Sequence, residues 1–116
     1  MDDELAMVGG MVKRPDFLPD EVIDACKSYR DAVRVSWEYR RIKQMHRCTL
    51  AERIDRKAQH VSDYLAQDDE PHRRNLPADS LDLWACAVGN FGVQQWLNRQ
   101  SRLTILEEVI AERAAA

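Results

Sequence analysis

Apolar side chains recur at helical spacing from residue 20 onward, and the first such stripe predicts a long helix. Its members lie three or four residues apart: Val22, Cys26, Tyr29, Val33 and Trp37. Asp20 can cap this helix, and Glu21 and Asp24 add negative charge to its first turn. A second stripe of Val35, Tyr39 and Ile42 means that the helix is either buried on two sides or paired with another chain. Core packing is the first interpretation of Trp37, and a dimer contact is the alternative.

Residues 48–66 predict two short helices that pack at a sharp angle. Leu50 and Ile54 share one face, and Ala51 is small where the two helices must approach each other. Thr49 is the expected N-cap of the first helix, with Glu52 completing a capping box. The inner face of the second helix is formed by Val61, Tyr64 and Leu65. Its outward positions are then Lys57, Ala58, Gln59, His60, Ser62 and Asp63.

Three further elements follow the helical hairpin. Residues 67–77 contain two prolines and many charges, which predicts a surface loop. A short helix begins at Asp79 or Ser80 and ends at Gly89, with one apolar face formed by Leu81, Trp84, Ala85 and Val88. Another helix spans residues 91–100, and a separate amphipathic segment spans residues 103–110.

These elements divide the chain into three parts. Residues 1–18 have an acidic start, two adjacent glycines and no sustained periodicity, so we expect a flexible arm there. Residues 19–102 form the helical domain. Residues 103–116 form a C-terminal helix whose stripe is Leu103, Leu106, Val109 and Ile110. This stripe either mediates self-association or packs back on Trp37 or Trp96.

The hairpin resembles the helix-turn-helix of the lambda-repressor/Cro-like family of DNA-binding proteins. Leu50-Ala51 and Val61-Ser62 match the pattern of that family. Asp55 stands where the family has Gly, and Asp tolerates left-handed backbone better than most residues. Arg56 stands where the family has an apolar residue. The order of hairpin, proline-marked loop and two glycine-separated helices extends the resemblance over about residues 20–100.

The resemblance implies an all-α, compact domain of five to six helices, and a dimeric regulator of transcription, a repressor, of phage or mobile-element origin. Double-stranded DNA is the expected partner, with residues 58–66 in the major groove. The expected base contacts, led by Gln59 and Ser62, are Lys57, Ala58, Gln59, His60 and Ser62. The expected backbone contacts are Arg47, Thr49, Arg53, Arg56, Arg73 and Arg74.

The charge of the chain is unevenly distributed. The 116 residues carry a net charge of -3, but residues 40–60 hold seven basic and two acidic side chains. That segment has a balance of +5, and the remainder a balance of -8. Because phosphate attraction is local, the basic segment favours DNA contact where it coincides with the motif. A solvated helix face is the alternative interpretation of the basic segment. A small helical protein of a mobile element that binds or inhibits another protein without binding DNA is the alternative function, and the acidic remainder favours it.

Other classes of function have little support in the sequence. No apolar run approaches the roughly 20 residues of a membrane span, and the acidic start lacks the basic flank of a signal peptide. Cys26, Cys48 and Cys86 are odd in number and widely spaced, which predicts reduced, mostly packed thiols and a cytoplasmic location. His46 and Cys48 lack a second ligand pair, and no catalytic motif is present, so we expect no metal, cofactor, small-molecule substrate or enzymatic activity.

Overall fold

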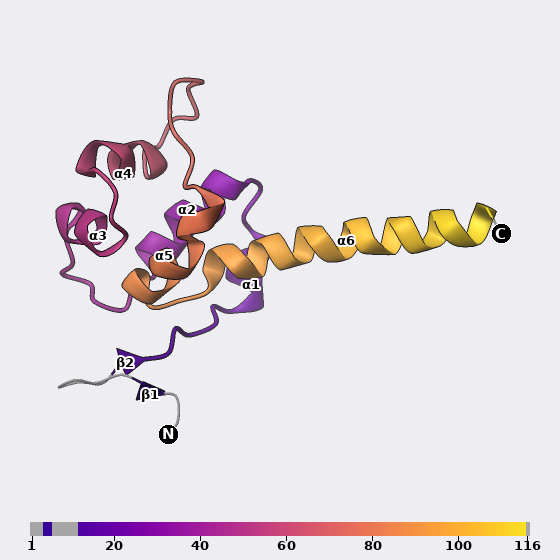
Figure 1. Ribbon diagram of the computed structural model, residues 1–116, viewed down its shortest axis with the longest axis horizontal. Helices are drawn as coiled ribbons and strands as arrows, with labels where there is room; N and C mark the ends of the chain where they lie inside the picture. The colour runs from indigo at the N-terminus through magenta and orange to yellow at the C-terminus, as the bar shows by residue number, and fades with distance from the viewer. Residues whose placement is uncertain (1–3, 6–11, 116) are drawn as a thin grey trace.

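The computed structural model describes residues 4–5 and 12–115, with side chains for residues 14–102 and 105–115 (Figure 1). The regular secondary structure of this part of the chain is helical apart from two short antiparallel strands, β1 (Glu4–Leu5) and β2 (Val12–Lys13). The helices are α1 (Asp20–Asp24), α2 (Tyr29–Glu38), α3 (Arg47–Arg53), α4 (Ala58–Tyr64), the 3-10 helix η1 (Ala78–Ser80), α5 (Leu81–Val88) and α6 (Gly92–Ala115). The expectation of an all-helical chain with five to six α-helices is confirmed for these residues.

The core lies where α2, α3, α4, α5 and the start of α6 meet. Trp84 of α5 is completely buried at its centre, as are Leu50 of α3 and Val61 of α4. Trp37 packs against this cluster from α2, which favours the core interpretation of that side chain. Burial of these apolar side chains is the main stabilising contribution to a domain of this size. The core therefore fixes α3 and α4 against the rest of the molecule.

The long first helix expected from Asp20 onward is wrong, because the chain breaks between α1 and α2. Ser28 Oγ accepts a hydrogen bond from the Asp31 backbone N–H at 3.1 Å. The Asp31 carboxylate accepts one from the Lys27 backbone N–H at 3.0 Å. The first bond satisfies an N–H group that a new helix leaves unpaired, and the second holds the residue before the N-cap, so a second helix begins at Tyr29. The stripe from Val22 to Trp37 is therefore divided between two helices.

The segment before α1 is attached to the body from residue 14 onward, where Arg14 O accepts a hydrogen bond from Arg41 Nη2 at 2.7 Å. Asp16 exchanges backbone hydrogen bonds with the α5–α6 connection, donating to Gly89 O and accepting from Phe91 N, both at 2.9 Å. Leu18 is buried, and the Gln95 side chain bonds both its N–H and its carbonyl oxygen. Residues 16–18, which the sequence assigned to a flexible arm, thus pack on the body, whereas residues 1–3 and 6–11 of that arm lie outside the described residues.

The glycine stop after α5 is confirmed, but the two C-terminal segments are one helix. Gly89 has φ 83°, and a Cβ there would lie 2.7 Å from Arg41 Cβ. Asn90 Oδ1 then accepts a hydrogen bond from Gly92 N at 3.0 Å, where α6 begins. No Gly or Pro follows Gly92, so α6 continues without interruption for 24 residues. The expected break between residues 100 and 103 is wrong.

A buried polar cluster fixes α2 against α5 and α6. Trp84 Nε1 donates to Ser36 Oγ at 2.7 Å, and Ser36 Oγ donates to Val33 O at the same distance. Asn90 Nδ2 donates to Ser36 O at 3.0 Å. Since these buried groups all have partners, the cluster specifies one arrangement of the three helices.

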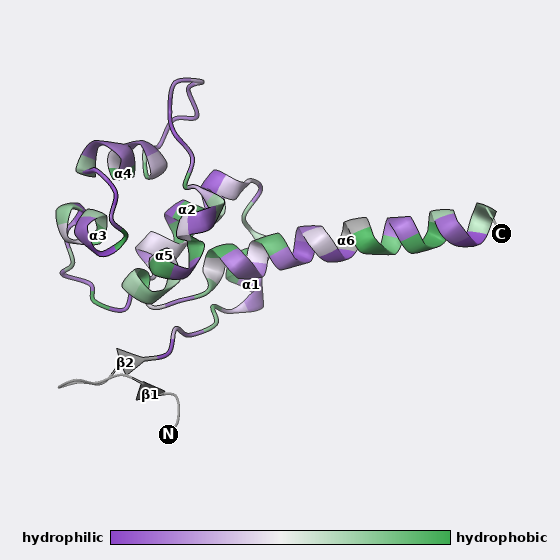
Figure 2. Cartoon of the chain, viewed as in Figure 1, coloured by the Kyte–Doolittle hydropathy of each residue, from purple (hydrophilic) through white to green (hydrophobic). Residues whose placement is uncertain are grey.

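The C-terminal half of α6 extends away from the body (Figure 1), with apolar and polar residues alternating along it (Figure 2). Ile105, Leu106, Val109 and Ile110 are all exposed. They do not fold back on Trp37 or Trp96; Trp96 Nε1 instead donates to Cys26 O at 3.2 Å. The described helices include none that is both long and apolar enough to cross a membrane.

Two of the three cysteines differ from the expectation of packed thiols. Cys26 is buried against α6, and burial raises the pKa of its thiol. Cys48 on α3 and Cys86 on α5 are exposed, and all three are free thiols. Their helical positions explain the difference, since each lies on the outward face of its helix.

Candidate nucleic-acid interface

The first helix of the hairpin begins earlier than the sequence indicated. The Leu50 backbone N–H donates to His46 O at 3.1 Å, so the helix is already established before Thr49. His46 is the N-cap of α3, and Thr49 is its half-buried third residue. The assignment of Thr49 as the cap is therefore wrong, and with it the capping box to Glu52.

The turn between α3 and α4 contains one residue with left-handed backbone. Asp55 has φ 56°, the only positive φ outside glycine among the described residues. The Arg56 N–H donates to Ala51 O at 2.9 Å and the Asp55 N–H donates to Glu52 O at 3.2 Å, which is the Schellman pattern of a helix end. The prediction that Asp55 adopts left-handed backbone is confirmed. An L-residue there costs about 1 to 2 kcal/mol relative to Gly, which the hydrogen bonds of the turn offset.

The buried face of α4 is the one that the sequence predicted. Val61 and Tyr64 are buried, and Leu65 follows them into the core. The helical spacing therefore turns Gln59 and Ser62 toward solvent, and both are exposed. Of the remaining predicted base-contacting residues, Lys57 and Ala58 are exposed, and His60 is half-buried.

Asp63 departs from the outward position expected for it. It is buried on α4, and two arginines of the following loop hold its carboxylate: Arg73 Nη1 at 3.2 Å and Arg74 Nη1 at 2.8 Å. Loss of solvent raises the pKa of Asp63, but the hydrogen bonds from these arginines outweigh it, so the pKa lies below its ordinary value. Asp63 is therefore an ion-pair acceptor that attaches the loop to α4.

The guanidinium of Arg73 bonds two carboxylates. Besides Asp63, it bonds both oxygens of Asp68, from Nε and Nη2, at 3.0 Å each. The hydrogen bond from Arg73, followed by the one from the Glu70 backbone, lowers the pKa of Asp68 to about 2. Such bidentate pairs hold the guanidinium in a fixed plane. Arg73 and Arg74, both expected on phosphates, thus have acidic partners within the chain.

Arg56 also has partners inside the molecule. Its Nε donates to Ser80 Oγ at 3.0 Å, and its Nη2 forms an ion pair with Asp79 at the same distance. These contacts join the turn of the hairpin to η1. Arg56 stands where the family has an apolar residue. Its guanidinium joins the turn to η1 by hydrogen bonds instead of by burial of an apolar side chain.

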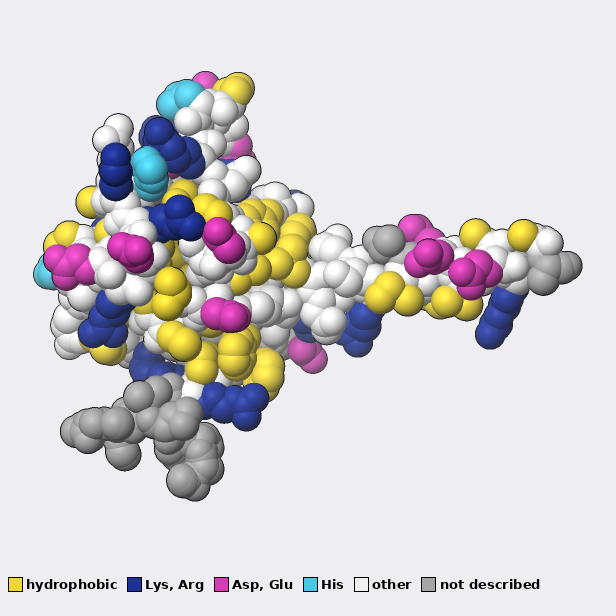
Figure 3. Space-filling view, in the orientation of Figure 1, with side chains coloured by type: hydrophobic (Ala, Val, Ile, Leu, Met, Phe, Trp, Pro, Cys, Tyr) yellow, Lys and Arg dark blue, Asp and Glu magenta, His cyan; other side chains and the backbone are white. Residues whose placement is uncertain are grey.

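Three basic side chains of the hairpin have no such partner. In the part of the chain that the structure describes, Arg47, Arg53 and Lys57 make no ion pair or side-chain hydrogen bond. All three are exposed, Arg47 and Arg53 on α3 and Lys57 at the N-cap of α4. Figure 3 shows basic and histidine side chains over α4 and the following loop, with acidic side chains nearby over α3. A hollow of about 540 Å³ lies at the turn, lined by Ala51, Glu52, Asp55, Arg56 and Lys57.

Arg30 and Arg34 of α2 also shape this surface, and sequence reasoning missed both. Arg30 donates from Nη2 to Asp63 O at 2.7 Å, from Nη1 to Arg74 O at 2.9 Å and from Nε to the Asp69 carboxylate at 2.9 Å. Arg34 donates to Ala66 O at 2.9 Å. These bonds satisfy carbonyls at the end of α4, where a cation is favourable. Two arginines four residues apart on α2, together with the acidic run after α4, were the available signal.

His60 is the titratable group on the outward side of α4. Desolvation, followed by the positive charges of Arg74 and Lys57, lowers its pKa from the ordinary value. The imidazole is therefore mostly neutral at pH 7. In this form one ring nitrogen donates a hydrogen bond and the other accepts one.

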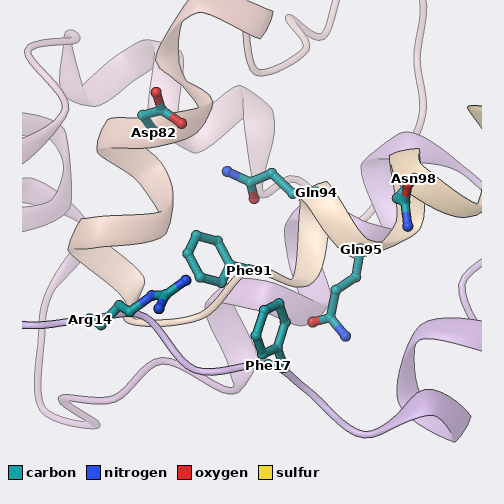
Figure 4. Close-up of a pocket in the computed structure, with 7 residues that line it drawn as sticks. All are labelled: Arg14, Phe17, Asp82, Phe91, Gln94, Gln95 and Asn98. Atoms are coloured by element: carbon teal, nitrogen blue, oxygen red, sulfur yellow. The ribbon is translucent and has the colours of Figure 1, made fainter. Parts of the chain in front are cut away.

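A second hollow lies between residues 14–17, α5 and α6 (Figure 4), with a volume of about 360 Å³. The rings of Phe17 and Phe91 are 5.3 Å apart in its wall, and Gln94 Oε1 is buried there without a partner. None of the residues predicted to contact DNA lies in it. Among the described residues, no group of His, Cys, Asp or Glu is arranged to hold a metal ion.

Comparison of the chain with protein-family models, with curated proteins and with solved structures gave no match. The interpretation of the hairpin therefore depends on its own geometry and charge. Those features are a left-handed turn, an α4 whose inner face is buried in the core, and exposed polar and basic side chains on the outer side of the hairpin.

Proposed function

We propose that this chain is a sequence-specific double-stranded DNA-binding regulator of transcription, a repressor, and that α4 enters the major groove. The observation that carries the proposal is the outward pair Gln59 and Ser62 on a helix whose opposite face is locked into the core. A recognition helix needs this combination, because base contacts require side chains held at fixed positions. Gln can bond adenine through two atoms, and Ser can bond several base edges.

In this proposal the contacts to bases and to phosphates come from different parts of the hairpin. Gln59 and Ser62 read base edges, with Lys57, Ala58 and the mostly neutral His60 beside them. Arg47 and Arg53 approach the backbone from α3. Phosphate contacts of this kind position the protein, whereas base contacts specify the sequence.

The paired arginines have a different role in the proposal from the one that the sequence suggested. Arg56, Arg73 and Arg74 hold α4 and its flanking segments in place through Asp63, Asp68 and Asp79. Of these three arginines, Arg74 is exposed, so its side chain can still leave its carboxylate partner and contact a phosphate. Their contribution to affinity is then smaller than that of unpaired side chains, because the nearby carboxylates repel phosphate.

A second candidate is a small helical protein of a mobile element that binds another protein and not DNA. The observation that favours it is the same pairing, since three of the basic side chains at the hairpin are matched by acidic ones. The exposed apolar residues of α6 would then supply a contact surface.

Selection of random duplex DNA by the purified chain, with sequencing of the retained molecules, tests the proposal. We expect one enriched motif. The logarithm of the affinity should fall linearly with the logarithm of the salt concentration, because neutralised phosphates release counterions. The variants Gln59→Ala and Ser62→Ala should weaken the enriched site by about 1 to 3 kcal/mol and leave random DNA nearly unaffected. Gln44→Ala, an exposed glutamine outside the hairpin, is the matched control. Absence of retention at low salt would favour the protein-binding alternative.

A further inference from the structure

The projecting part of α6 carries an apolar side that nothing in the described chain covers. Leu106 and Ile110 are 56% and 58% exposed, and Val109 beside them is 37% exposed. Figure 3 shows hydrophobic side chains at both the lower and the upper edge of the projecting helix, with acidic ones between them. Isolated helices shorter than about 12 to 15 residues are marginal in water, so a projecting helical segment gains stability from packing against a partner.

The spacing of this stripe fits a paired helix. Leu106 and Ile110 are four residues apart, and Leu103 precedes Leu106 by three in the sequence. Steps of three and four place these positions at a, d and a of a heptad, the seam along which two helices pack. Ile105 lies about 100° around the helix from Leu106 and falls outside that seam.

Charges beside the seam favour one orientation of the two helices. Arg102 and Glu107 fall at the g and e positions of the heptad, on opposite sides of the stripe. About 140° of helix rotation separates them, so they cannot pair within one chain. Within the described residues neither makes an ion pair. In a parallel pair, Arg102 of each copy lies beside Glu107 of the other, and symmetry gives two such contacts.

We propose that two copies of this chain pair in parallel through residues 102–110 of α6. Both bodies then lie at the same end of the paired helices. The two α4 helices can therefore face the same side, as binding to two DNA half-sites requires, and this last step rests on the proposed function. An antiparallel pair would place the bodies at opposite ends.

The paired segment is short, and its length sets the expected strength of association. Nine residues of helix extend about 14 Å, so the buried area falls below the roughly 1,200 Å² of a stable interface. We expect a dissociation constant in the micromolar range for the free chain. On DNA with two half-sites, the same contact becomes intramolecular and strengthens binding.

Sedimentation of the full chain over a range of concentrations, without DNA, tests the pairing. Leu106→Ser should abolish association while circular dichroism of the body is retained. Arg102→Glu and Glu107→Arg should each weaken it by about tenfold, because two attractive contacts become repulsive. The double variant should restore association. Glu108→Arg, which makes the same charge change about 160° away from the seam, is the matched control and should have little effect.

Different outcomes would overturn the pairing and the proposed function. A chain that stays monomeric up to about 1 mM, or that associates only with lipid vesicles, has no such pair. Single variants that weaken association without rescue by the double variant would exclude the parallel orientation. A dimer that fails to bind DNA would leave the pairing in place and remove the proposed function. A chain that binds DNA strictly as a monomer would do the reverse.

Discussion

Two sets of basic side chains on the hairpin and the loop after it differ in whether they have acidic partners. Arg56, Arg73 and the neighbouring Arg74 form ion pairs with aspartates at 2.8 to 3.2 Å. Arg47, Arg53 and Lys57 have no acidic partner in the described chain. Both sets look alike in the sequence, yet only the second offers uncompensated charge. The comparison teaches that a count of basic residues overstates the charge available to a polyanion.

The paired set has a structural task that the unpaired set lacks. The Asp63 side chain is only 12% exposed, and the hydrogen bonds from both of its arginines favour its ionised form. Arg30 supports the same region from α2 by bonding the backbone of Asp63 and Arg74. Removal of a paired arginine should therefore affect folding before it affects binding.

The largest expected effect on stability comes from replacing Arg30, which supports the loop that carries Arg73 and Arg74. Arg30→Ala deletes the hydrogen bonds of Arg30 to Asp63 O and Arg74 O and its ion pair with Asp69, which together join α2 to the end of α4 and to the loop. We expect a loss of about 3 kcal/mol in the free energy of unfolding, measured by urea titration. Lys27→Ala, an exposed position in the α1–α2 connection, should change it by less than about 0.5 kcal/mol. Equal stability of the two variants would show that Arg30 does not hold the loop.

A smaller loss of stability is expected when an arginine of the paired set is replaced. Arg74→Ala removes one of the two partners of Asp63 but leaves the contact with Arg73. The free energy of unfolding should fall by about 1 to 2 kcal/mol, because a partly buried carboxylate loses a charged hydrogen bond. Asp63→Asn in the same background should recover part of the loss. If Asp63→Asn has no effect there, the cost does not arise from the unpaired carboxylate.

The unpaired set should show the opposite behaviour. Arg53→Ala should leave the urea midpoint unchanged and weaken binding to specific and random DNA by the same few-fold factor. The slope of log affinity against log salt should become shallower by about 1, the value for one phosphate contact. Thermal melts and DNA titrations on the same samples separate the two effects. A change in sequence preference would contradict the assignment of Arg53 to the backbone.

The smallest effect concerns pH and again separates the two sets. The pKa of Asp68 in the fold is about 2, below the ordinary value of about 3.9 for an unfolded chain. Its contribution to stability is therefore present above about pH 4 and is lost as the pH falls toward 2. Asp63 acts in the same direction, because its pKa is also lowered. Asp68→Asn should flatten this part of the stability profile, while Arg53→Ala should leave it unchanged.

The sequence by itself determined the elements whose causes are local. The left-handed turn at Asp55 and the glycine stop at Gly89 depend on backbone preferences of single residues, and both are confirmed. The buried face of α4 follows from the spacing of Val61, Tyr64 and Leu65 along one helix. Exposure of Gln59 and Ser62 is the consequence of that spacing.

Only the tertiary structure decided which charges are available and where helices are interrupted. Whether Arg73 faces solvent or Asp63 depends on the path of the loop, and Arg30 directs that path from more than 30 residues away. The break before α2 arises because Ser28 and Asp31 compete with helix continuation, an outcome that α1 packing on α6 stabilises. Periodicity records which residues avoid water, whereas ion pairs and helix ends depend on partners that are distant in sequence and close in space.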